Sequence, residues 1–228
     1  MKAKIAAVAL ATIAVLLSPI NTNSATAINE KCAIYDFKEI FFADFSTGSK
    51  WDNSQGARTI TWSAGAMTIY DEDSVRPFTE TEIDWIRSAF KSWDDALNTV
   101  SFLEVASSQT PEVVIGFVGL KPSNVQLTAM GFWNTWVENG KRYKATIKLK
   151  AADKKWFAVR SQFIHTVQHE LGNVLGLGDL KPSKSFASVL EDPWQPPYGK
   201  ANLSTTDTAL IRQLYGESTC VANPHTKP

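Results

Sequence analysis

The stretch Gln168–Asp179, which reads QHELGNVLGLGD, constrains the fold of this chain more than any other. Through it and just before it, apolar residues recur at steps of three and four, at Ile164, Val167, Leu171 and Val174. This spacing predicts an amphipathic helix with one face in the core and its polar residues on the other side. The polar residues of the stretch then carry most of its chemistry.

Two of these polar positions, His169 and Asn173, are four residues apart and are therefore expected on one face of the helix. Two ligands at this spacing can share one metal ion, and Glu170 is placed to hold a metal-bound water. Gly176 can take a positive φ, end the helix and turn the chain sharply, so that Asp179 swings back toward the same point. The arrangement predicts a catalytic zinc site with an open coordination position.

The same stretch resembles the metzincin signature H-E-x-x-H-x-x-G-x-x-H/D, and its flanks look most like the matrixin-type members, including small bacterial secreted ones with Asp last. The resemblance implies that His169 and Asp179 are zinc ligands, that Glu170 is the general base and that Gly176 is the turn. One position departs, because Asn173 stands where the second histidine belongs. A neutral amide oxygen is a poor zinc ligand beside imidazole, so we expect weak zinc binding and low activity.

The resemblance also assigns the surroundings of the site. Leu190 occupies the place of the methionine that metzincins carry in a tight turn under the zinc, and it keeps an apolar floor of similar volume. Leu190, Pro196 and Tyr198 would line the substrate pocket, although a solvent-side proline-rich turn explains Pro196 and Tyr198 almost as well. Residues 128–136 are our choice for the edge strand that binds peptide substrate through backbone hydrogen bonds.

The remaining pattern predicts an α+β fold. Alternating or apolar segments indicate strands at 59–63, 100–105, 112–118 and 145–149, with 67–70 continuing the first of them or pairing with it. A capping box at Thr79 and Glu82 starts a helix of roughly 18 residues, and further helices are expected at 156–174 and 204–215. The matrixin resemblance covers about 51–216. It implies a metzincin-like catalytic domain with a twisted mixed five-stranded sheet, two long helices and a small C-terminal helical subdomain.

The first 27 residues have the pattern of a secretory signal peptide, with two lysines, an apolar run at 5–17 and the small residues of 25–27. Removing them takes away two of 23 basic residues and none of 23 acidic ones, leaving 21 against 23. This balance favours neither nucleic acid nor an anionic membrane as partner. We expect a secreted, extracellular monomer acting on peptide or protein substrates, with an N-terminal segment at 28–50 and a C-terminal tail at 217–228.

The two cysteines, Cys32 and Cys220, lie near opposite ends of the expected mature chain. In an oxidising compartment we expect a disulfide between them, which would stabilise the fold by about 2–4 kcal/mol. The matrixin resemblance raises a second reading, in which the Cys32 thiolate caps the zinc as a latency switch. Matrixin propeptides do this from a Pro-Arg-Cys-Gly context, whereas Cys32 lies between Lys31 and Ala33.

Three alternatives remain open from the sequence. Asn173 is compatible with a secreted pseudo-protease that keeps the fold and cleft to bind peptides or partners without cleaving them. His165 and His169 are also four residues apart, so a metal site displaced by one turn is conceivable. A buried structural histidine at 169 is the third. The sequence also leaves open whether calcium (Ca2+) is bound in addition to Zn2+.

Overall fold

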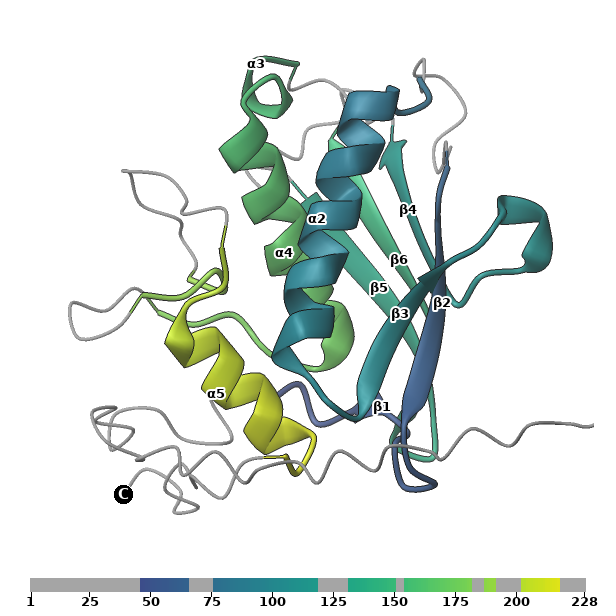
Figure 1. Ribbon diagram of the computed structural model, residues 1–228, viewed down its shortest axis with the longest axis vertical. Helices are drawn as coiled ribbons and strands as arrows, with labels where there is room; N and C mark the ends of the chain where they lie inside the picture. Colours follow the sequence, from purple (N-terminus) through teal and green to yellow (C-terminus); the bar gives the residue numbers. More distant parts are fainter. Residues whose placement is uncertain are drawn as a thin grey trace, which may run out of the picture. The chain divides into compact units, whose positions relative to one another are not determined.

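The computed structural model describes residues 46–65, 76–118, 131–150, 154–181, 187–191 and 202–217. Helices α2 and α4 lie side by side across one face of a single sheet (Figure 1). The sheet has six strands: β1 (Lys50–Trp51), β2 (Arg58–Ala64), β3 (Val100–Glu104), β4 (Val113–Val118), β5 (Gly131–Glu138) and β6 (Lys141–Lys150). Within the described residues, no helix is long and apolar enough to cross a membrane.

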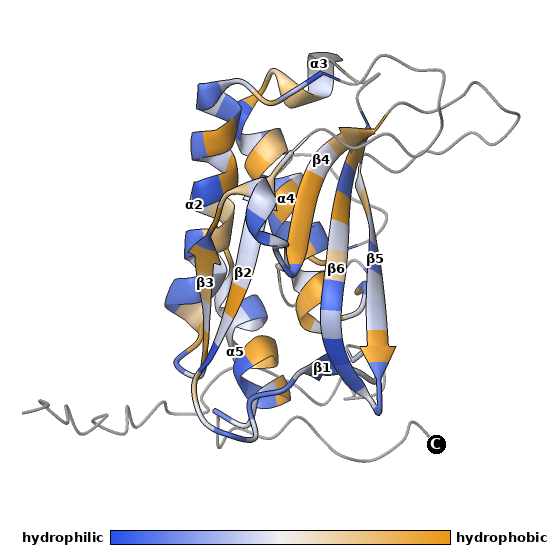
Figure 2. Ribbon diagram, turned by 90° about the vertical axis from the view of Figure 1, so that its right-hand side faces the viewer, coloured by the Kyte–Doolittle hydropathy of each residue, from blue (hydrophilic) through white to orange (hydrophobic). Residues whose placement is uncertain are grey.

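The strand order is β1-β6-β4-β2-β3, with β5 paired to β6. Every pairing is parallel except that between β5 and β6, which is antiparallel, so the expected mixed sheet is confirmed. The described sheet has six strands where five were expected: the two-residue β1 was not anticipated, and β5 overlaps the segment 128–136 that was chosen as edge strand. The strand expected at 67–70 lies outside the described residues. Figure 2 shows that β4 is apolar along its length, as a strand in the middle of a sheet requires.

Two helices begin at capping boxes, of which the one at Thr79 and Glu82 was expected from the sequence. Helix α2 (Glu80–Ala96) starts after Thr79, whose hydroxyl accepts from the backbone of Glu82 while the Glu82 carboxylate accepts from the backbone of Thr79. Helix α5 (Thr205–Leu214) starts in the same way from Ser204 and Asp207. These contacts satisfy backbone N–H groups that have no partner inside the helix, which is why short sequence motifs predict both starts. A short 3-10 helix, η2 (Ser107–Gln109), precedes β4.

Helix α4 (Arg160–Leu175) differs from its expected form in two ways. It begins four residues later than 156, because Val159 has extended backbone angles and separates it from the short helix α3 (Lys154–Phe157). The polar side of α4 was expected to face solvent, but twelve of its sixteen residues are buried. The reason is that α4 packs against α2, β5 and β6. Polar side chains on α4 are therefore enclosed by protein.

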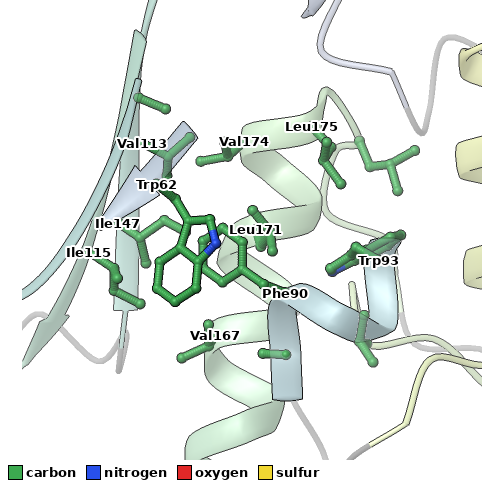
Figure 3. Packing of buried hydrophobic residues seen from close by; sticks show 14 of the residues in the cluster. Trp62, Phe90, Trp93, Val113, Ile115, Ile147, Val167, Leu171, Val174 and Leu175 are labelled. Atoms are coloured by element: carbon green, nitrogen blue, oxygen red, sulfur yellow. The ribbon is translucent and has the colours of Figure 1, made fainter. Parts of the chain in front are cut away.

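The apolar face of α4 fills the space between α2 and the sheet (Figure 3). Leu171 and Val174 point into this space, and Trp62 of β2 stacks on Phe90 of α2 with ring centroids 4.1 Å apart. Full burial of one large apolar side chain stabilises a fold by about 1.5–3 kcal/mol. The packing thus holds the helix that carries the candidate site rigidly against the sheet.

Candidate functional site

The chain leaves α4 through a turn that only glycine allows. Gly176 has φ +115, and a Cβ built there would lie 2.5 Å from the backbone oxygen of Ser49. Both its positive φ and this close approach exclude a side chain. The N–H groups of Gly176 and Leu177 donate to the carbonyl of Gly172, which closes the helix and directs the chain back toward Asp179.

The last carbonyls of α4 receive hydrogen bonds from three distant parts of the chain. Arg142 of β6, only 3% exposed, donates to the carbonyls of Asn173 and Val174. Trp51 Nε1 donates to Val174 at 3.0 Å, and the hydroxyl of Tyr215 donates to Leu175 at 2.8 Å. Burial lowers the pKa of Arg142 to about 10, so the guanidinium stays charged at neutral pH and faces the negative end of the helix dipole.

The turn brings His169, Asn173 and Asp179 together. His169 Nε2 lies 3.2 Å from Asp179 Oδ1, and the amide nitrogen of Asn173 donates to the same oxygen at 2.8 Å. The Asn173 nitrogen also lies 3.4 Å from the carbonyl oxygen of Leu177. Two side chains of α4 thus converge on one carboxylate oxygen beyond the helix end.

The other ring nitrogen of His169, Nδ1, lies 2.8 Å from the carbonyl oxygen of Val189, to which it donates when protonated. Burial by itself lowers the pKa of His169, but the hydrogen bond with Asp179 and the negative charges of Glu170 and Asp179 outweigh it and raise the pKa to about 9. Without a metal, His169 is therefore an imidazolium at neutral pH. The contact with Val189 fixes the ring so that Nε2 faces Asp179.

Segment 187–191 passes beneath the site and is held by Asp207 of α5. The Asp207 carboxylate accepts from the Ser188 hydroxyl and from the Val189 N–H at 3.2 Å. Leu190 is fully buried, and Gly172 gives it room, because a Cβ on Gly172 would lie 2.7 Å from Leu190 Cδ2. The sequence predicts the helix at 204–215, which Asp207 helps to cap, but it gives Asp207 no role of its own. Its second role depends on a contact across 18 residues that no local motif reveals.

The carboxyl of Glu170 lies against the start of β5. Glu170 is 5% exposed, and the position where Gly131 would carry a Cβ is next to its carboxylate. β5 pairs antiparallel with β6, and its other side has no strand partner in the described part of the chain.

The segment chosen as edge strand, 128–136, overlaps β5, while 128–130 are outside the described residues. Also outside the described residues are Pro196, Tyr198, Cys32 and Cys220. Their assignments remain predictions.

A zinc ion in a protein takes nitrogen, thiolate or carboxylate oxygen ligands, and the site offers two of these kinds. Imidazole and carboxylate are groups that zinc accepts as ligands, and those of His169 and Asp179 approach one another to 3.2 Å. The Asn173 nitrogen faces two acceptors, whereas its oxygen is buried without a hydrogen-bond partner. Rotating the amide would turn that oxygen toward a cation. The set therefore fits zinc held by two strong ligands and one weak ligand.

A metal site displaced by one turn has less support. Burial, and then the charge of His169, lower the pKa of His165 to about 3, so its imidazole is neutral. However, within the ranges that the structure covers, no three His, Cys, Asp or Glu side chains form a group that could hold a metal ion. Among the described residues neither this pair nor the pair His169 and Asp179 has a third strong ligand, but His169 and Asp179 approach one another to 3.2 Å.

Comparison with known proteins gives one family match. The family model described as Matrixin, a peptidase family, matches residues 50–216. No curated protein sequence matches the chain at a significant level. Two structures of myroilysin are similar to it, one at 13% identity and TM-score 0.47 over 74% of this chain and 86% of that chain. The other has 12% identity and TM-score 0.48 over 75% and 83%. A GM1-bound ECX AB5 holotoxin has 12% identity and TM-score 0.36 over 75% and 77%.

Proposed function

Because this chain belongs to the matrixin family of peptidases, we propose that it is a secreted, zinc-dependent endopeptidase whose activity is weakened by Asn173. The observation that carries the proposal is the 3.2 Å approach of His169 Nε2 to Asp179 Oδ1, beside the Glu170 carboxylate. The 1–27 segment, with its signal-peptide pattern, supports secretion.

The residues of the candidate site have different parts in this function. Zinc bound at His169 and Asp179 would supply a Lewis acid for the scissile carbonyl. Glu170 takes a proton from the attacking water and delivers it to the leaving amine. The Val189 carbonyl keeps a proton on His169 Nδ1, which leaves Nε2 free as the ligand nitrogen.

Substrate binding is assigned to the side of β5 that has no strand partner among the described residues. An extended peptide would add to this edge through backbone hydrogen bonds, as strands do in β-augmentation. Because β5 starts at the Glu170 carboxyl, a peptide on this edge would pass beside the general base. Leu190 forms the apolar floor, and Pro196 and Tyr198 complete the proposed pocket.

A zinc titration of the secreted protein tests this function. The protein is first stripped of metal with a chelator, and cleavage of a quenched-fluorescence peptide library is then followed as zinc is added. We expect slow cleavage that rises with zinc and that Glu170→Gln abolishes, while zinc affinity stays within about two-fold because Glu170 is not a ligand.

Cleavage that survives in Glu170→Gln, or in excess chelator, would contradict the proposal. Peptide binding without cleavage at any zinc concentration would identify an inactive binding protein instead. This is the second function that Asn173 allows.

A further inference from the structure

Gly131 is a glycine for reasons of space. A Cβ built at this position would lie 2.7 Å from Glu170 Oε1, 2.8 Å from Glu170 Cγ and 3.0 Å from Glu170 Cδ. Gly131 is not among the described glycines with positive φ, so its backbone conformation alone would accept alanine. What excludes a side chain here is the close approach of a single acidic residue.

In response to a Cβ at Gly131, the Glu170 side chain would move before the strand does. Gly131 pairs with Leu149 of β6, which is fully buried, so the backbone of β5 is held in place at this point. The three nearest atoms that a Cβ would meet all belong to the Glu170 side chain, and none of them belongs to a backbone. Ordinary contact begins at 3.4 Å, so the carboxylate oxygen would have to move by about 0.7 Å.

From these contacts we propose that Gly131 is a positioning residue, whose missing side chain sets where the Glu170 carboxylate lies over the start of β5. The inference rests on the proposed function insofar as Glu170 is the general base. A misplacement of about 1 Å can lower a catalytic rate about 100-fold. Because Glu170 moves more easily than the backbone, Gly131→Ala should disturb proton transfer much more than folding.

The chain offers a matched control in Gly65. It lies directly after a strand, is not among the glycines with positive φ, and a Cβ there would meet nothing within 4 Å. Gly65→Ala therefore makes the same chemical change without touching Glu170. Any effect common to both variants belongs to the loss of a glycine, and an effect of Gly131→Ala alone belongs to the contact.

The first measurement needs no activity. The side-chain carboxyl carbon of Glu170 is observed by 13C NMR in the metal-free protein and assigned with Glu170→Gln. We expect its resonance to shift in Gly131→Ala and to stay in place in Gly65→Ala, with thermal unfolding midpoints of both variants close to the parent's. An unchanged Glu170 resonance in folded Gly131→Ala would overturn the inference.

The second measurement is a double-mutant cycle in the Asn173→His background, chosen for its expected higher activity. Gly131→Ala should lower kcat about ten-fold or more, while KM and zinc affinity stay within about two-fold. Combined with Glu170→Asp, whose side chain is one methylene shorter, Gly131→Ala should have less than a two-fold further effect. Equal effects in both backgrounds would show that the contact is not the cause.

Failure of the proposed function would look different. In that case no variant cleaves, Gly65→Ala included, and the NMR resonance alone decides whether Gly131 sets the position of Glu170.

Discussion

Replacing Asn173 with histidine tests the site most directly. Asn173 is 1% exposed, and its nitrogen donates to Asp179 at 2.8 Å. The substitution removes this hydrogen bond and places an imidazole one helical turn after His169, at the spacing by which two histidines share a metal. It restores the ligand that the family pattern has at this position.

The size of the effect follows from the loss of one ligand bond. Removing a partner that only orients a ligand lowers metal affinity about 10–100-fold, so a ligand itself should be worth at least about 100-fold, or about 2.7 kcal/mol. In the zinc-free protein the larger ring must fit a close-packed interior, which costs about 1–3 kcal/mol. We therefore expect a lower unfolding temperature than the parent's without zinc and a higher one at saturating zinc.

Zinc affinity is measured by competition with a fluorescent chelator, and unfolding temperatures with and without zinc provide a second readout. Asn173→Leu is the matched control, because leucine is near asparagine in size and has no ligand atom. It should not raise zinc affinity. If the natural protein binds zinc as tightly and cleaves peptides as fast as Asn173→His, the reasoning about the amide is wrong.

Three further outcomes are expected. Asp207→Asn weakens the support of Val189 and should destabilise the fold by about 1–3 kcal/mol in urea unfolding, with about ten-fold weaker zinc binding; an unchanged unfolding curve would contradict this role. The pKa of His165 is lowered to about 3 from an ordinary 6.5, so stability should fall as pH drops below 6.5, by about 2 kcal/mol at pH 5, and His165→Leu should flatten that dependence. Mass spectrometry of the unreduced secreted protein should find Cys32 and Cys220 joined; two alkylatable thiols would argue for the latency switch instead.

Much of the fold was predictable because its signals are local. The capping boxes at Thr79 and Ser204 fix helix starts through contacts three residues apart, and Gly176 ends α4 because a positive φ favours glycine. Strand β4 was predictable as a short apolar run. The metal-type residues of α4 were found from a spacing of four, and the turn at Gly176 does place Asp179 beside His169.

Other features depended on contacts between residues far apart in the sequence. The sequence pattern of α4 indicates one buried face, but α2, β5 and β6 together enclose almost the whole helix. The sequence around Arg142 gives no sign that this arginine is buried, because its hydrogen bonds are made to the end of α4, about 30 residues away. Neither the second role of Asp207 nor that of Gly131 has a local motif.

By itself, the sequence determined which side chains this protein offers for chemistry. They are His169, Glu170, Asp179 and Asn173, the last of which differs from the histidine of the family pattern. The tertiary structure decided how they meet. The amide of Asn173 turns its nitrogen toward Asp179, and the Glu170 carboxylate occupies the space left by Gly131. The physical reason is that spacing along one helix specifies a shared face, whereas the orientation of an amide and the room for a carboxylate depend on atoms that other elements bring within about 3 Å.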